Sequence, residues 1–200
     1  MHHSKKALKK EIDQSREGFT WLKILQLFRL FLPKNTRTLT TLKKFSDFDP
    51  VSIQKKYGIK IEGVILDVDE TISLNRGKIL PANINHLKKL LKHGIKIVLM
   101  SNMVKTSRYD VLDKRIKVMT NFAPKPEPGG FKKAIKYLDV PKKNIVMIGD
   151  NYITDGGAIR LGIPFVRVRP IQKKHRTFPE TIHNAIRKFF IVLAKIYQKK

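Results

Sequence analysis

From residue 61 onward, runs of continuous apolar residues alternate with stretches of helical spacing. "IEGVILDV" (61–68) is typical of a strand buried on both faces, whereas "PANINHLKKLLKHG" (81–94) has helical spacing, begins with proline and ends with glycine. The same order continues with strands predicted at 95–102, 115–119, 144–150 and 164–168 and helices predicted at 104–112, 129–140 and 153–161. This alternation predicts an α/β fold in which helices cover both faces of a mostly parallel sheet.

The pattern divides the chain into three parts. Residues 59–170 form the predicted α/β core, residues 1–58 a basic N-terminal extension with an amphipathic helix, and residues 171–200 a basic C-terminal helix. Within the last part, "IHNAIRKFFIVLAKIY" (182–197) is a basic amphipathic stretch that follows the final strand closely. We therefore expect it to pack on the core.

The N-terminal extension contains the densest apolar stretch of the chain, "FTWLKILQLFRLFL" (19–32). On a helical wheel, most of its aromatic and aliphatic side chains share one broad face, while Lys23, Gln26 and Arg29 lie opposite. The stretch is too short and too polar to span a membrane, and no small-residue cleavage site of a secretory signal follows it. A Trp- and Phe-rich face beside basic side chains is typical of a helix in a bilayer interface. Packing on the core or on a partner is the alternative.

Charge adds a second constraint, because the chain has 42 basic and 16 acidic residues and a formal net charge of +26. The excess is densest in residues 166–200, which carry ten basic side chains and one acidic side chain. Such a field attracts phosphates on lipid headgroups, on nucleic acid or on a small substrate, although a lysine-rich genome would produce it too. The chain has no cysteine, which excludes disulfides and thiolate metal sites and fits a reducing compartment.

Polar side chains stand where the predicted strands end, the edge at which parallel sheets bind their ligands. They are Asp67 and Asp69 after the first strand, Ser101 and Asn102 after the second, Asp150 and Asp155 after the fourth, and Lys125 in the loop "APKPEPGG" (123–130). Any one of them alone would be read as structural, since a strand-end serine usually caps the next helix. Two carboxylates buried side by side, however, cost free energy unless a metal, a proton or a cation compensates. The set therefore predicts a site.

Four motifs occur in order: "DVDET" (67–71), "LMSN" (99–102), Lys125 within "KPEP" (125–128), and "GDNYITD" (149–155). With these motifs, residues 60–170 resemble the haloacid dehalogenase (HAD) superfamily of phosphohydrolases. The resemblance implies a Rossmann-like, three-layer sandwich. It also implies a Mg²⁺-dependent phosphatase that forms an aspartyl-phosphate intermediate.

The resemblance assigns a role to each candidate residue. Asp67 is the expected nucleophile, and Asp69 the expected general acid that then becomes the base activating water. Ser101, Asn102 and Lys125 are expected to bind the phosphoryl group, with Lys125 also neutralising the developing charge. The Mg²⁺ ligands are expected to be Asp67, Asp150 and the backbone carbonyl of Asp69, while Asp155 supports Lys125 or a metal-bound water.

The spacing of the motifs bears on the substrate. About thirty residues separate Asp69 from Ser101, and a predicted helix and strand use most of them, which excludes a large cap domain there. Within the superfamily, the chain resembles the phosphatidylglycerophosphate phosphatase branch in its "LFLPK" lead-in (30–34), in "GIKIVLMSN" (94–102) and in the lack of a cap. It departs from that branch at two places, because the branch reads DLDNT for "DVDET" and Asn-Asn where this chain has Asn102 and Met103.

We therefore expect a peripheral membrane enzyme that dephosphorylates phosphatidylglycerophosphate to phosphatidylglycerol. Its partner would be an anionic phospholipid surface on the cytoplasmic side, or on the matrix side in a mitochondrion. A phosphatase of soluble or nucleic-acid phosphomonoesters is one alternative, and an RNA- or ribosome-associated binding protein on the same fold is another. Nucleic acid is the less favoured partner, because basic residues are not interleaved with exposed aromatics in an RNA-binding motif.

Overall fold

The computed structural model describes residues 38–74, 77–103, 107–120 and 122–171, together with the separate positions Leu25, Phe28 and Val192. Its centre is a parallel sheet with the strand order β1-β6-β5-β2-β3-β4. The strands are β1 (Thr38–Leu42), β2 (Gly63–Asp67), β3 (Lys96–Met100), β4 (Lys117–Met119), β5 (Ile145–Gly149) and β6 (Phe165–Val168). The predicted α/β fold with a parallel sheet is confirmed.

Helices and 3-10 turns connect these strands. They are η1 (Phe45–Asp47), α3 (Pro50–Tyr57), α4 (Pro81–Lys92), η2 (Ser107–Tyr109), α5 (Pro128–Leu138), η3 (Lys142–Asn144), α6 (Tyr152–Asp155) and η4 (Gly156–Leu161). Proline occupies the first position of α3, α4 and α5, where its missing N–H costs no helical hydrogen bond. Gly94, with φ of 76°, turns the chain from the end of α4 into β3.

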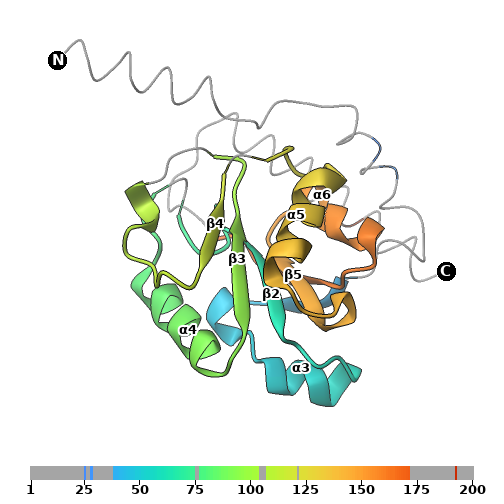
Figure 1. Cartoon of the computed structure of the whole chain (residues 1–200), viewed down its shortest axis with the longest axis horizontal. Helices are drawn as coiled ribbons and strands as arrows, with labels where there is room; N and C mark the ends of the chain where they lie inside the picture. Colours follow the sequence, from blue (N-terminus) through green and yellow to red (C-terminus); the bar gives the residue numbers. More distant parts are fainter. Residues whose placement is uncertain are drawn as a thin grey trace, which may run out of the picture.

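The sheet separates two apolar layers. In β2, Val64 and Leu66 pack in one cluster with α4, η1 and α3, while Ile65 packs in the other with α5, α6 and η4. Successive residues of a strand point to opposite faces, so the unbroken apolar run of β2 serves both layers. Figure 1 shows α4 on one side of the strands and α5 and α6 on the other, the arrangement of a three-layer sandwich.

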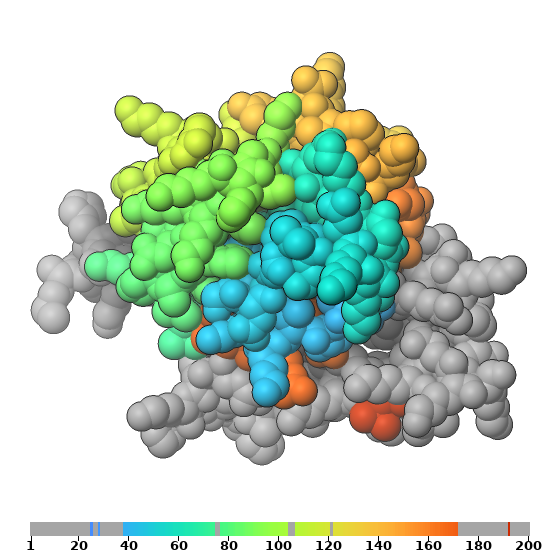
Figure 2. Space-filling model, turned by 90° about the horizontal axis from the view of Figure 1, so that it is seen from below, coloured from blue at the N-terminus to red at the C-terminus, as the bar shows by residue number. Residues whose placement is uncertain are grey.

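The sheet begins earlier in the chain than the predicted core boundary at residue 59. Strand β1 pairs with β6 at the edge of the sheet, and Phe45 and Phe48 are buried in the core beside α4. Figure 2 shows the surface of residues 45–60, in blue and cyan, beside the green surface of α4. The strand was missed because "TLTTL" (38–42) is a short edge strand of three threonines and two leucines, mostly half-buried, and lacks an apolar run.

Two other expectations change. The helix predicted at 104–112 is, over its described residues, the 3-10 turn η2 followed by turns, and the strand after it covers only 117–119. The N-terminal and C-terminal amphipathic helices predicted at 19–32 and 182–197 lie outside the described residues, apart from Leu25, Phe28 and Val192.

The connections that could carry a cap domain are short. Residues 68–80 join β2 to α4 and contain bridges of Ser73 to Asp69 and Ile79, and residues 101–116 join β3 to β4. Neither connection is long enough for a domain. Within the residues that the structure describes, every helix is too short or too polar to cross a bilayer.

Candidate active site

Strand β2 places both carboxylates of "DVDET" at the carboxyl edge of the sheet. Asp67 is its last residue, and β2 lies between β5 and β3 in the middle of the sheet. The chain then reverses at Glu70, which has φ of 61° and whose N–H donates to the carbonyl of Ser73. The tight reversal keeps Asp69 beside the strand end, two residues beyond Asp67.

Lys125 forms the centre of a buried ion cluster. Its side chain is 2% exposed, and its Nζ donates to Asp67 and, at 2.7 Å, to Oδ1 of Asp155. The backbone N–H of Lys125 donates to the side-chain oxygen of Asn102 at 3.0 Å, which ties this loop to the end of β3. Thr71 adds a hydroxyl that donates to Asp67 at 3.0 Å.

The second carboxylate oxygen of Asp155 is also held in place. This oxygen, Oδ2, accepts the backbone N–H of Asn151 at 3.1 Å. A Cβ added at Gly149 would lie 2.2 Å from Oδ2 of Asp155, so only glycine allows this carboxylate to approach the end of β5 so closely. Asp155 thus contacts Lys125, and its supporting role in the reaction stays a prediction.

Asp67, Asp150 and Asp155 are the carboxylates that could hold a metal. Within the described residues, one oxygen from each lies within 4.8 Å of the others, and all three side chains are buried. When all are ionised, these three carboxylates carry three negative charges and Lys125 carries one positive charge. The cluster therefore has two negative charges in excess. Burial, and then the charge of Asp155, raise the pKa of Asp67 to about 7 despite Lys125.

A hard divalent cation fits this donor set, because oxygen ligands suit Mg²⁺ and two positive charges would balance the cluster. Asp67 and Asp150 would hold the ion, with the backbone carbonyl of Asp69 as the further ligand that the resemblance implies. When bound, the ion would keep Asp67 ionised and polarise a phosphoryl oxygen.

A second ion pair lies on the other side of the loop and involves Arg108, a residue that the sequence analysis did not select. Its guanidinium donates to both carboxylate oxygens of Asp69, at 2.5 and 3.0 Å, and its side chain is 3% exposed. Ser101 also donates to Asp69, at 3.0 Å. Burial raises the pKa of Asp69, but the bonds from Arg108 and Ser101 outweigh it and hold that pKa below its usual value.

All seven candidate residues are described, and they fall into two connected groups. Asp67, Asp150, Asp155, Lys125 and Asn102 surround the end of β2 on one side, and Asp69 and Ser101 meet on the other. Asn102 contacts the backbone of Lys125, so its predicted contact with phosphate stays a prediction. Arg108 comes from η2 and matches none of the four motifs, so spacing gave no signal for it.

Comparison with known proteins places these residues in a family. A model of haloacid dehalogenase-like hydrolases matches residues 49–161, more than half of the chain. The Bacillus subtilis (strain 168) protein described as "Probable phosphatase YqeG" is 28% identical over 114 residues, which cover 56% of this chain and 66% of that relative, just under two thirds. A crystal structure of an uncharacterised protein from Listeria monocytogenes serotype 4b aligns with a TM-score of 0.45 and 20% identity over 58% of this chain and 85% of that one. The chain belongs to the haloacid dehalogenase-like hydrolase family.

Proposed function

We propose that this protein is a Mg²⁺-dependent phosphatase of phosphatidylglycerophosphate that works at the surface of an anionic membrane. The observation that carries the phosphatase chemistry is the buried cluster in which Lys125 bridges Asp67 and Asp155 within reach of Asp150. A purely structural ion pair would not need three acidic side chains around one lysine, because burying an unbalanced charge is costly.

The residues divide the work of phosphoryl transfer. Asp67 attacks phosphorus with a carboxylate oxygen and forms an aspartyl phosphate, while the bond to the leaving oxygen breaks. Lys125 neutralises charge on Asp67 and on the phosphoryl oxygens. Asp69 donates a proton to the leaving oxygen and later removes one from the water that hydrolyses the intermediate. When bound by Asp67 and Asp150, Mg²⁺ would add charge neutralisation at the phosphoryl group.

Three observations support a lipid substrate. Among the described residues, the short connections place no cap domain over the site, which suits a headgroup held in a surface. Leu25 and Phe28 are helical and lie three residues apart, so they share one helix face, and they are 41% and 66% exposed, which favours an apolar face that is not buried in the core. The N–H of Ile171 donates to the carbonyl of Glu70, so the basic sequence from residue 172 onward starts beside the catalytic loop.

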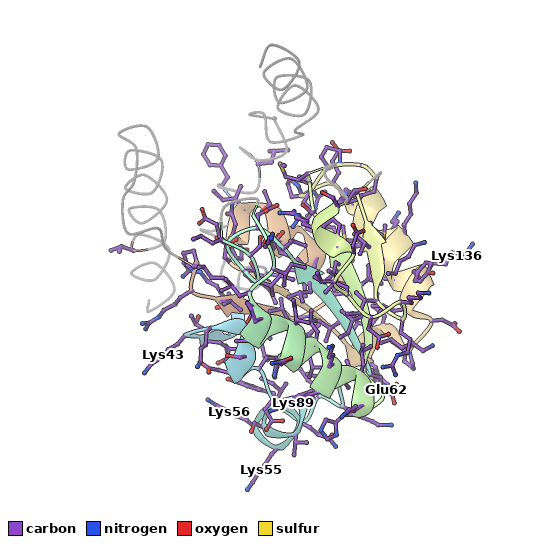
Figure 3. All side chains as sticks on the ribbon, turned by 90° about the vertical axis from the view of Figure 1, so that its left-hand side faces the viewer. Lys43, Lys55, Lys56, Glu62, Lys89 and Lys136 are labelled. Atoms are coloured by element: carbon purple, nitrogen blue, oxygen red, sulfur yellow. The ribbon has the colours of Figure 1, made fainter. Side chains whose placement is uncertain are left out.

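Lysines on the core do not by themselves select a partner. Figure 3 shows Lys43, Lys55, Lys89 and Lys136 on different elements, with side chains directed outward. Charge spread in this way solvates the surface and attracts any polyanion, so the proposed selectivity for lipid rests on the two flanks.

The experiment is phosphate release from phosphatidylglycerophosphate in mixed micelles with Mg²⁺, beside soluble phosphomonoesters including a 5′-phosphorylated oligonucleotide. Asp67→Asn should reduce turnover by about 10³-fold or more. Asp139→Asn is the matched control, since it makes the same change at the exposed end of α5 in a left-handed backbone that asparagine accepts. Chelation of divalent metal should stop turnover.

A preference for the lipid that disappears in Asp67→Asn would support the whole proposal. Turnover of soluble or nucleic-acid esters alone would leave the chemistry and remove the lipid. Turnover of nothing, together with tight salt-sensitive RNA binding, would instead indicate a binding protein built on this fold.

Membrane binding is tested separately from chemistry. Phe28→Glu should weaken binding to phosphatidylglycerol vesicles roughly 10- to 100-fold and leave hydrolysis of a soluble ester unchanged. Val51→Glu is the control, because Val51 is equally apolar and exposed but lies on α3 of the core. Equal effects of the two substitutions on vesicle binding would contradict an interfacial role for the N-terminal helix.

A further inference from the structure

Arg108 has more hydrogen-bonding capacity than its observed partners use. One terminal nitrogen donates to Asp69, and the other reaches Asp69, Ser101 at 3.1 Å and the hydroxyl of Tyr109 at 2.9 Å. Its Nε is buried and has no partner among the described residues. A guanidinium so fully removed from water normally has every N–H satisfied, so one acceptor is missing from this arrangement.

The position of Arg108 indicates what that acceptor is. Arg108 contacts Asp69 and Ser101, the two side chains that meet the phosphoryl group in the proposed function. A carboxylate that binds the two terminal nitrogens end-on leaves Nε empty. A phosphoryl group carries three terminal oxygens, so it can bind a terminal nitrogen and Nε together, as guanidinium groups commonly bind phosphate.

We propose that Arg108 binds the phosphoryl group of the substrate and that Asp69 occupies this position only until substrate arrives. The incoming phosphoryl oxygens take over the guanidinium, and Asp69 is released toward the leaving oxygen. This inference rests on the proposed function, because it uses the same site. It names an anion-binding residue outside the four motifs and couples substrate binding to the freeing of Asp69.

The burial of the pair supports an exchange of this kind. The Arg108 side chain is 3% exposed and that of Asp69 19%, so removing Asp69 from Arg108 without a replacement anion would leave the buried guanidinium without a counter-charge. A phosphoryl dianion supplies that replacement.

The test measures Mg²⁺-dependent binding of inorganic phosphate to the full-length protein by calorimetry. Arg108→Ala should raise the Kd roughly 10- to 100-fold, and added guanidinium ion should restore part of the binding. Arg108→Lys keeps the charge but loses the two-nitrogen fork. Its Kd should therefore lie between those of the wild type and Arg108→Ala. Arg115→Ala is the matched control, because Arg115 also binds one carboxylate with two nitrogens, here Nε and a terminal nitrogen on Asp113, but at the surface, where its side chain is 62% exposed.

A double-mutant cycle separates exchange from simple repulsion between Asp69 and phosphate. Asp69→Asn removes the competitor and should tighten phosphate binding severalfold, although turnover is lost. In the Arg108→Ala background the same substitution should give no gain. A gain of equal size in both backgrounds would overturn the exchange.

The result separates this inference from the proposed function. Unchanged phosphate binding in Arg108→Ala, with a lower melting temperature and normal hydrolysis in the wild type, would show a structural ion pair and overturn only this inference. A wild type that binds no phosphate and hydrolyses no ester would overturn both.

Discussion

Asp67 and Asp69 are chemically identical and two residues apart, yet the protein surrounds them differently. Burial and the neighbouring Asp155 raise the pKa of Asp67 to about 7. Asp69 is only partly buried, and although this burial raises its pKa, its hydrogen bonds to Arg108 and Ser101 hold that pKa below its usual value. Deeper burial and the charge of Asp155 separate Asp67 from Asp69, and the cations add to the difference, since Lys125 is shared between two carboxylates whereas Arg108 places two nitrogens on one.

This difference shows where the site needs an added charge. The surroundings of Asp69 are balanced by Arg108, so that side of the loop is complete without metal. The surroundings of Asp67 hold more negative than positive charge, so that side favours a divalent cation. Pairs of carboxylates whose environments push their pKa values apart are how one site assigns different roles to the same side chain.

The largest effect is expected from removing the shared cation. Lys125→Met leaves Asp67 and Asp155 buried without it, so unfolding free energy should fall by about 3–5 kcal/mol and turnover by about 10²–10³-fold. Urea unfolding and initial rates on a soluble ester measure the two losses. Lys136→Met is the control, because Lys136 projects into solvent from α5 (Figure 3). Equal stability of the two variants would contradict the role of Lys125 in balancing the cluster.

Asp69→Asn tests the balanced side. It leaves the buried guanidinium of Arg108 without a counter-charge, so we expect the metal-free protein to lose about 2–4 kcal/mol of stability near neutral pH. Inorganic phosphate should recover part of this loss in a thermal melt, because it supplies the missing anion. A variant as stable as the wild type would mean that Arg108 does not depend on Asp69.

Asp67→Asn, in contrast, should increase the stability of the metal-free protein at high pH. In the folded protein the pKa of Asp67 is about 7, above its ordinary value of 3.8, so the stability that this group contributes is present below pH 4 and is lost as pH rises through 7. Asparagine has no such loss. Without metal, the variant should gain about 1–3 kcal/mol over the wild type at pH 8 and almost nothing at pH 4.

Urea unfolding of both proteins in chelator, across that pH range, measures this gain. Mg²⁺ should reverse the order, because the wild type keeps the ligand that the variant has lost. A difference that does not change with pH would contradict the raised pKa of Asp67.

The sequence predicted the motif residues of this site better than the residues that contact them. The unbroken apolar runs before Asp67 and Asp150 identify central strands, and parallel strands bring their carboxyl ends to one edge, so those residues followed from pattern and motif. Strand β1 was missed because a five-residue edge strand made mostly of threonine has no apolar run to mark it. Arg108 was missed for another reason, since its contact with Asp69 depends on the path of η2, which no periodicity in residues 104–112 specifies.

The smallest effect is expected at Glu70, the residue that follows Asp69. Its φ of 61° lies in the left-handed region, where side chains other than Asn, Asp and Gly cost about 1 kcal/mol, and its carbonyl is fixed by the N–H of Ile171. Asparagine adopts this backbone conformation more readily than glutamate. Glu70→Asn should therefore stabilise the protein by about 0.5–1 kcal/mol in a thermal melt, and it also removes a negative charge beside two others. The substitution keeps the backbone of the turn, and the turn sets the distance between the two carboxylates. Asp67 and Asp69 should therefore keep their different surroundings, and the pH dependence of stability should not change. A variant that loses stability would mean that the glutamate side chain itself holds this turn.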